Sequence, residues 1–273
     1  MSGGTLTRRS FLAAAVAISG TAGGFAAGRA TAPRRRDAEL PPGTVTDTNL
    51  LRRAVQPDAV FRVDTDEPLV ALSFDDGPDP AYTPQVLDLL ARHHTNATFF
   101  AVGINALAHP DLVGRQVAAG HTIGNHTRSH PDLEQLTPEQ VAAEIDGGEA
   151  DIEAAGAPRP NLFRPPKGFT DEVVGVFADA EHYRTIFWDA AVEHYVRHLG
   201  VSTGIERLLA KVDRGSIILA HDGGHTPGRP VIDRTSTVQA LPLLLDGLDR
   251  RGLRVVDVPT LLSLDRRRVV RAS

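Results

Sequence analysis

Cysteine is absent from all 273 residues of the chain. Its absence excludes disulfide bonds, thiolate metal ligands and a cysteine nucleophile, so any metal ion must be held by histidine, aspartate or glutamate side chains. It does not place the protein inside the cell, because exported bacterial proteins of this size often do without disulfides. With 41% hydrophobic and 23% charged residues, the composition is that of a globular protein with a sizeable core.

Acidic residues are missing from the first 36 positions, whereas the remainder of the chain is acidic. A mature chain that begins at Pro33 would lose three arginines and keep 26 basic residues against 34 acidic ones, a net charge of −8. Because nucleic-acid binding depends on clustered positive charge, this balance argues against nucleic acid as a partner.

A pair of arginines, Arg8-Arg9, precedes a stretch of small apolar residues at 13–28. This is the pattern of a twin-arginine export signal, and the Ala-Thr-Ala sequence at 30–32 supplies a cleavage site. A disordered basic tail or an uncleaved anchor is the alternative, although the stretch is weakly apolar for a membrane span. We expect residues 1–32 to be a signal peptide recognised by the twin-arginine (Tat) export machinery, and the mature protein to be secreted or associated with the cell wall.

The segment 33–66 is rich in Pro, Asp, Thr and Arg and has little periodicity, so we interpret it as a linker and leading segment. Residues 67–273 are expected to form a single catalytic domain. No internal repeat is visible in the sequence.

Short apolar runs alternate with amphipathic stretches after residue 67. Strands are expected at 69–74, 97–102, 183–188, 216–220 and 253–256. Helices are expected after Thr83-Pro84 and at 111–119, 138–155, 202–212 and 237–251. Thr83 is expected to be an N-cap, and Thr137 to Gln140 form a capping box. This alternation predicts an α/β fold with parallel strands and crossover helices, either a barrel or a doubly wound sheet.

Polar side chains follow several of these strands. Asp75-Asp76 follows the first strand, Arg164 follows a short strand, and His221 follows the run at 216–220. Because catalytic groups in such folds lie at the carboxyl ends of the strands, we expect these residues to share one site.

Asp75-Asp76-Gly77-Pro78 places two carboxylates next to each other at the end of a buried strand. Their repulsion would be relieved by a cation or a nearby arginine. A simple polar turn is the alternative, since Asp, Gly and Pro are common turn residues.

His126 and His130 are four residues apart, a spacing that on a helical turn places both imidazoles on one face, where they can bind one metal ion. A pair of histidines at this spacing often has no shared function. Here it follows a strand that is expected to end near Asn125, and two histidines with one carboxylate make a three-ligand site with open positions, as a hydrolytic metal requires.

Together these residues resemble the polysaccharide deacetylase family, the NodB-homology or family 4 carbohydrate esterases, over residues 68 to 260. The resemblance rests on two long motifs, Ser-Phe-Asp-Asp-Gly-Pro at 73–78 and Gly-Asn-His-Thr-Arg-Ser-His at 124–130. It implies a distorted (β/α) barrel of about seven parallel strands in a single catalytic domain.

The resemblance also implies roles for individual residues. Asp75 would be the general base, and a divalent metal, most often Zn²⁺ in this family, would be held by Asp76, His126 and His130. The segment at 163–168 resembles a third motif, in which Arg164 would orient Asp75.

Leu219-Ala220-His221 resembles a further motif, in which His221 would be the general acid that protonates the departing sugar nitrogen. A backbone N–H near Lys167 would stabilise the oxyanion. Pro166, Lys167, Tyr195 and Leu219 are the expected substrate contacts, although Tyr195, like Trp188, is equally well explained by core packing.

Two departures from the family pattern affect the catalytic histidine and the sugar site. Lys167 stands where the third motif carries an aromatic residue. In the fourth motif, Ala191 and His194 occupy positions where acidic residues are expected, and Tyr195 replaces a tryptophan.

The acidic residue of the fourth motif is thought to support the catalytic histidine. Glu193 and Asp222 are the two candidates to compensate for its loss.

We expect metal-dependent N-deacetylation of an amino-sugar polysaccharide such as peptidoglycan or chitin oligomers. An O-acetyl esterase acting on a glycan such as xylan would use the same residues. A non-haem iron oxygenase also uses two His and one carboxylate, but leaves the paired aspartates without a role. A glycan-binding module that has lost turnover is the alternative from another class, favoured by the altered third and fourth motifs and opposed by the intact catalytic set.

Overall fold

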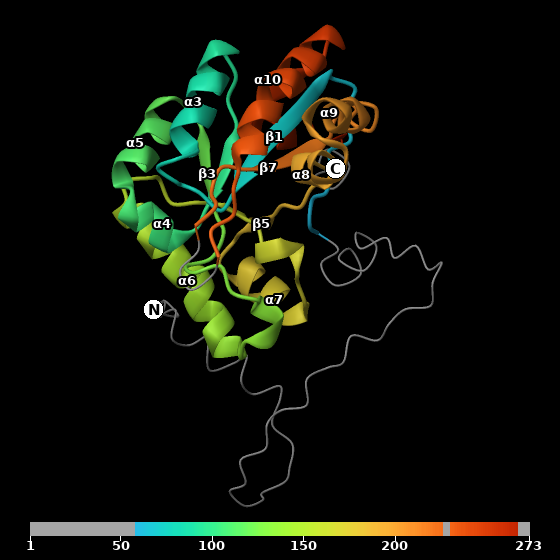
Figure 1. The fold of residues 1–273 in the computed structure, drawn as a ribbon. Helices are drawn as coiled ribbons and strands as arrows, with labels where there is room; N and C mark the ends of the chain where they lie inside the picture. The colour runs from blue at the N-terminus through green and yellow to red at the C-terminus, as the bar shows by residue number, and fades with distance from the viewer. Residues whose placement is uncertain (1–57, 226–229, 267–273) are drawn as a thin grey trace, which may run out of the picture. The chain divides into compact units, whose positions relative to one another are not determined.

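The computed structural model describes residues 58–225 and 230–266 (Figure 1). The predicted signal peptide at 1–32 and the predicted linker up to residue 57 lie outside the described residues. All described residues belong to one compact unit. Within them, no helix is both long enough and apolar enough to cross a membrane.

The strands and helices alternate along the chain. The strands are β1 (Leu69–Asp75), β2 (Thr98–Ala101), β3 (Thr122–Asn125), β4 (Leu162–Phe163), β5 (Arg184–Thr185), β6 (Ala190–Ala191), β7 (Ile217–His221) and β8 (Arg254–Val256). The helices are α3 (Thr83–Arg92), α4 (Gly103–Ala108), α5 (Pro110–Ala118), α6 (Pro138–Ala154), α7 (Glu172–Ala180), α8 (Val192–Leu199), α9 (Val201–Leu209), α10 (Thr235–Arg250) and α11 (Val258–Leu262).

The strands form one curled parallel sheet in the order β5-β4-β3-β2-β1-β7-β6, and β8 pairs with the first half of β1. Every ladder between these strands is parallel, as crossover helices require. All seven residues of β1 are buried, which is expected of the central strand of a parallel sheet. The expected distorted (β/α) barrel is therefore confirmed, and Figure 1 shows helices surrounding the sheet.

The leading segment closes the gap between the two ends of the sheet. Val60 N–H donates to Thr185 O at 2.9 Å, and Phe187 N–H donates to Val60 O at 2.7 Å. Val63 N–H donates to Gly215 O at 2.8 Å, just before β7. Val60 and Val63 are at most 3% exposed, so the folded domain uses residues that precede position 67.

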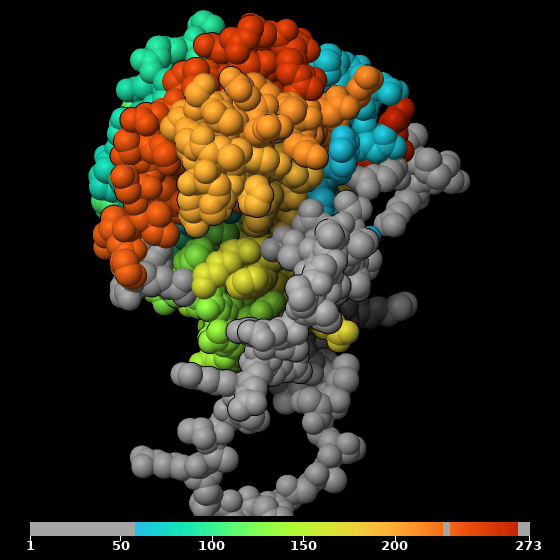
Figure 2. All heavy atoms as spheres, turned by 45° about the vertical axis from the view of Figure 1, so that its right-hand side comes forward, coloured from blue at the N-terminus to red at the C-terminus, as the bar shows by residue number. Residues whose placement is uncertain are grey.

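The main hydrophobic cluster lies between the sheet and the helices α3, α8, α9 and α10. It includes Leu90, Val196, Leu208 and Leu244, one from each of these helices, and all are buried. Figure 2 shows α8 and α9 packed side by side into one continuous surface next to α10. These helices hold β7 and the segments around it in position from outside the sheet.

The structure confirms some local predictions and corrects others. The capping box is present, since Gln140 N–H donates to Thr137 Oγ1 at 3.4 Å and Thr137 N–H donates to Gln140 Oε1 at 2.9 Å. The N-cap predicted at Thr83 is wrong. Tyr82 holds that position, and the buried Thr83 hydroxyl accepts from Asp79 N–H at 2.8 Å and donates to Asp222 Oδ2 at 2.6 Å.

Other elements differ in length from the prediction or were missed. The strand expected at 183–188 is limited to β5, because the backbone beyond it bonds partly to the leading segment. Helices α4, α7, α8 and α11 were not predicted, and all four have ten residues or fewer. With six and five residues, α4 and α11 make fewer than two turns, too few for a 3.6-residue pattern to stand out.

Two helix glycines provide a matched test of the packing around the loop that follows β3. Gly114 of α5 has nothing within 4 Å of an added Cβ, so Gly114→Ala should stabilise the protein by up to about 1 kcal/mol through helix propensity. At Gly148 of α6 an added Cβ would lie 2.4 Å from Asn125 Oδ1 and 2.7 Å from Thr127 C. Gly148→Ala should therefore destabilise the protein despite the same helix preference, as measured by denaturant unfolding. Equal stabilisation by both substitutions would contradict the packing described here.

Candidate active site

Asp75 and His221 end two neighbouring strands at the same edge of the sheet. Asp75 is the last residue of β1 and is paired in register with His221, the last residue of β7. Because residues in register on parallel strands direct their side chains to the same face, the two groups face one region. Asp76 follows directly in a left-handed conformation with φ of 74°, which turns the chain out of the strand.

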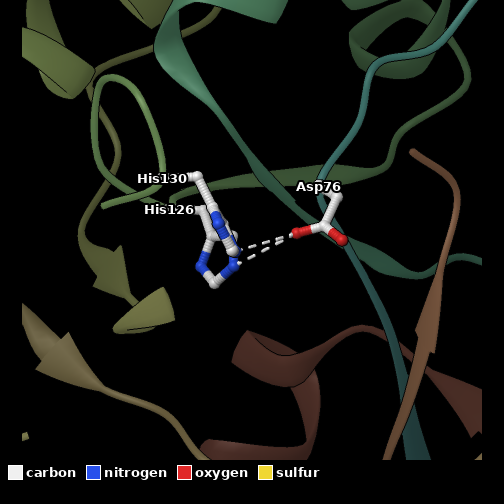
Figure 3. Close-up of side chains that lie close together, drawn as sticks. All are labelled: Asp76, His126 and His130. Atoms are coloured by element: carbon white, nitrogen blue, oxygen red, sulfur yellow. Dashed lines mark ion pairs between the residues drawn. The ribbon is translucent and has the colours of Figure 1, made fainter. Parts of the chain in front are cut away.

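Asp76, His126 and His130 converge on one point, as predicted from the sequence (Figure 3). Asp76 Oδ1 lies 3.6 Å from His126 Nε2 and 3.2 Å from His130 Nε2. Ligands at 2.0–2.1 Å from a tetrahedral zinc ion are about 3.3 Å apart. These separations fit the donor set of a divalent metal ion.

The orientation of the His126 ring also agrees with a role as a metal ligand. His126 Nδ1 lies 2.7 Å from the backbone oxygen of Arg164, and this oxygen can only accept a hydrogen bond. Nδ1 is therefore the ring nitrogen that donates to this oxygen, and Nε2 is the ring nitrogen that faces Asp76. A second-sphere contact that fixes the tautomer in this way is typical of histidines that bind metals.

The helical turn that was expected to bring the two histidines together is wrong. They do not lie on a helical turn, because Thr127 and His130 have φ angles of 69° and 59° in a loop after β3. Asn125 Oδ1 accepts from Thr127 N–H at 2.9 Å, and Thr127 Oγ1 accepts from His130 N–H at 3.1 Å. These side-chain hydrogen bonds hold the loop in its shape.

The surroundings of Asp76 favour the ionised form of its carboxylate. Burial raises its pKa, but the imidazoles of His126 and His130 and the charge of His221 outweigh burial and hold the pKa of Asp76 well below its usual range. An ionised carboxylate beside two imidazole nitrogens is the charge pattern that a divalent cation requires.

Arg164 fixes Asp75, as the sequence predicted. Its Nη1 lies 2.6 Å from Asp75 Oδ1, while Nε and Nη2 donate to the backbone oxygens of Ile186 and Phe187 at 3.0 and 3.2 Å. The guanidinium is fully buried. The second oxygen of Asp75 faces His126 Nε2 at 3.7 Å, on the side where Asp76, His126 and His130 converge.

Of the two candidates to support His221, Glu193 is in contact with it. Glu193 Oε2 lies 3.1 Å from His221 Nδ1, and Glu193 Oε1 accepts from Thr237 Oγ1 at 2.7 Å. Burial lowers the pKa of His221, but the charge of Glu193 and, to a smaller extent, that of Asp76 raise it above the usual value. The Asp222 carboxylate bonds to Thr83 instead, and burial raises the pKa of Asp222 to about 7.

The four expected substrate contacts have different environments. Lys167 has a φ of 58° in a short 3-10 turn after the buried Pro166, and its Nζ pairs with Asp132 Oδ1 at 2.5 Å. Leu219 is buried two residues before His221 on the same side of β7. Tyr195 packs against the main hydrophobic cluster, which agrees with the core-packing alternative for this residue.

Arg234 was missed by the sequence analysis. Its Nη2 lies 2.7 Å from Asp76 Oδ2, and the residue is 5% exposed. It occupies the N-cap position of α10, where positive charge is unfavourable because of the helix dipole. The sequence predicted this helix to begin only at residue 237, so it gave no signal that Arg234 belongs to the site.

Comparison with known proteins identifies the family. The family model described as polysaccharide deacetylase matches residues 62–185. A peptidoglycan-N-acetylglucosamine deacetylase of Bacillus cereus is 36% identical over 216 residues, which cover 78% of this chain and 98% of the relative. The chain belongs to the polysaccharide deacetylase family.

Further relatives agree with this assignment. A chitooligosaccharide deacetylase of a Bradyrhizobium species is 38% identical to the deacetylase described here over 200 residues, covering 70% of this chain and 90% of the relative. The crystal structure of a peptidoglycan N-acetylglucosamine deacetylase has a TM-score of 0.67 and 32% identity, covering 74% of this chain and 91% of that one. Members of this family depend on a metal ion, in agreement with the donor set of Asp76, His126 and His130.

The contact between Glu193 and His221 can be tested directly. Because the negative charge of Glu193 stabilises the imidazolium, Glu193→Gln should lower the pKa of His221 relative to the wild type in the same metal state. An NMR titration of the His221 ring measures the shift. Glu206→Gln, which changes an exposed glutamate of α9, is the matched control and should leave the titration unchanged. An unaltered His221 titration in Glu193→Gln would show that Asp76 or burial sets its protonation.

Proposed function

We propose that this deacetylase hydrolyses N-acetyl groups of an amino-sugar polysaccharide, with Zn²⁺ as the metal ion. The observation that carries the proposal is the position of Asp75. One of its oxygens is held by Arg164 at 2.6 Å, and the other faces the group formed by Asp76, His126 and His130. A carboxylate that would act as the base thus lies beside the three residues that would bind the metal ion, and His221 is in register with it on the next strand.

Asp76, His126 and His130 would hold the metal ion. A divalent cation there supplies Lewis acidity, which for Zn²⁺ lowers the pKa of water to about 7 and stabilises negative charge on the acetyl oxygen. The three residues leave part of the coordination sphere open for water and substrate, as a hydrolytic site needs.

Asp75 would act as the general base. Its oxygen that faces the metal-ligand group is in position to accept the proton of the attacking water. Arg164 contributes by orientation, because its other two hydrogen bonds anchor the guanidinium to the backbone between β5 and β6. The peptide N–H of Lys167, presented by a left-handed turn, would donate to the developing oxyanion.

His221 would act as the general acid. An amine leaving group must be protonated as the carbon–nitrogen bond breaks. Glu193 contacts Nδ1 and raises the pKa of His221, against the effect of burial, which favours the protonated ring that a general acid needs. Nδ1 faces Glu193, so Nε2 is the nitrogen that would donate to the sugar nitrogen.

We infer that the natural substrate is a polymer containing N-acetylglucosamine. The relatives named above are peptidoglycan-N-acetylglucosamine and chitooligosaccharide deacetylases. Export would bring the enzyme to the cell wall, where peptidoglycan is the nearest N-acetylated polymer.

If these roles are correct, removing the metal ion and replacing the base should each reduce acetate release, but only metal removal should empty the zinc site. Purified enzyme with Zn²⁺ should release acetate from N-acetylglucosamine oligomers or peptidoglycan, and chelation should abolish the release. Asp75→Asn should lower kcat by at least about 100-fold, the usual contribution of a general base, while zinc affinity changes little. Asp88→Asn, at an exposed position of α3, is the control and should keep full activity.

Two outcomes would contradict this function. Acetate released only from O-acetylated xylan would identify the enzyme as an O-acetyl esterase. Retention of most of the activity by Asp75→Asn would assign the base to another group.

We also propose that the protein is exported by the twin-arginine route and is secreted or associated with the cell wall. Arg8 and Arg9 precede a short stretch of small apolar residues with an Ala-Thr-Ala site at its end. Replacing both arginines with lysine in the full chain should leave the enzyme in the cytoplasm, as measured by fractionation and immunoblotting. Unchanged export of that variant, or equal activity after transport by an unfolded-chain route, would rule out a need for the twin-arginine machinery.

A further inference from the structure

Arg234 is a buried arginine at the start of α10, 158 positions in sequence from Asp76, which it contacts. Its Nη2 lies 2.7 Å from Asp76 Oδ2, and its Nε donates to the backbone oxygen of Gly223 at 2.8 Å. Burying a guanidinium is costly unless it is paired and hydrogen-bonded. Both contacts are made at the metal-ligand side of the site.

The two oxygens of Asp76 have different partners as a result. Oδ1 faces the Nε2 atoms of His126 and His130 at 3.6 and 3.2 Å. Oδ2 is occupied by Arg234. The carboxylate therefore offers a single oxygen to a metal ion, in a fixed orientation.

The backbone of Asp76 is held by the same part of the molecule. Gly223 packs against it so closely that an added Cβ would lie 2.3 Å from the Asp76 carbonyl carbon and oxygen. Asn105 Nδ2 donates to that oxygen at 2.9 Å. The contacts with Gly223 and Asn105 together hold the left-handed backbone of Asp76 in place.

The first turn of α10 reaches the other half of the site as well. Thr237 Oγ1 donates to Glu193 Oε1 at 2.7 Å, and Glu193 contacts His221. Arg234 and Thr237 are three residues apart and lie on one face of the helix. One helix end thus supports both the metal ligand Asp76 and the partner of His221.

We propose that Arg234 is a positioning residue of the metal site, which reserves Asp76 Oδ2 so that Asp76 binds the metal ion through Oδ1 alone. The proposal rests on the proposed function for the assignment of Asp76, His126 and His130 as metal ligands. It assigns to the start of α10 a role in metal affinity, in addition to its contact with Glu193.

Metal affinity of the purified protein tests the proposal without using turnover. Metal-free protein is titrated with Zn²⁺ against a competing chelating indicator, and folding is checked by thermal unfolding in chelator. Arg234→Gln should weaken zinc binding by about 10- to 100-fold, the usual cost of losing an outer partner of a metal ligand. Arg234→Lys keeps the positive charge but loses the planar guanidinium with its several N–H donors. It should therefore weaken zinc binding less than Arg234→Gln does.

Arg115→Gln is the matched control. Arg115 is an exposed residue of α5 that pairs with the exposed Asp88 at 3.4 Å, so its loss should leave zinc affinity unchanged. A folded Arg234→Gln variant with wild-type zinc affinity would overturn the proposal. If that variant does not fold, unchanged affinity in Arg234→Lys, together with an unchanged visible spectrum of the Co²⁺-loaded protein, would overturn it.

If the proposed function is wrong, the zinc titration of the wild-type protein gives a different result from the one expected for Arg234. Wild-type protein that binds no Zn²⁺ in the same titration would reject the metal site itself, and the role of Arg234 with it.

Discussion

Asp75 and Asp76 place two carboxylates side by side at the end of a buried strand, where their charges repel each other and water is largely excluded. Such a pair stays ionised only if positive groups surround it. Those groups come from segments far apart in the chain. Arg164 pairs with Asp75, Arg234 pairs with Asp76, and the histidines of the loop after β3 face both. The remaining structure brings these segments to one edge of the sheet.

The parallel sheet makes this assembly possible. Every strand that carries a site residue ends at the same edge, so the ends of β1 and β7 meet the short extensions beyond β1, β3 and β4. The outer helices then fix the extensions. Gly148 of α6 packs against the loop that carries the histidines, and the first turn of α10 contacts both Asp76 and Glu193. The site is therefore supported from the helical layer as well as from the sheet.

The site also shows how this chain retains an acidic partner for its histidine after departing from the family pattern. Ala191 and His194 stand at positions where acidic residues are expected, but α8 begins directly after β6 and turns Glu193 toward His221. The carboxylate reaches the imidazole from a neighbouring position of the same segment. Thr237 holds its other oxygen, so the pair has a defined orientation.

The family, the alternation of strands and helices, and the polar residues at the strand ends could all be predicted from the chain before folding was considered. These features depend on local patterns and on long contiguous motifs, which the chain displays directly. The choice between Glu193 and Asp222, the loop conformation of the two histidines and the contact of Arg234 with Asp76 could be seen only in the folded protein. Those outcomes depend on contacts between residues up to 158 positions apart, and on left-handed backbone at Asp76, Thr127 and His130. Distance in sequence hides such contacts, because packing between elements, and not local preference, sets them.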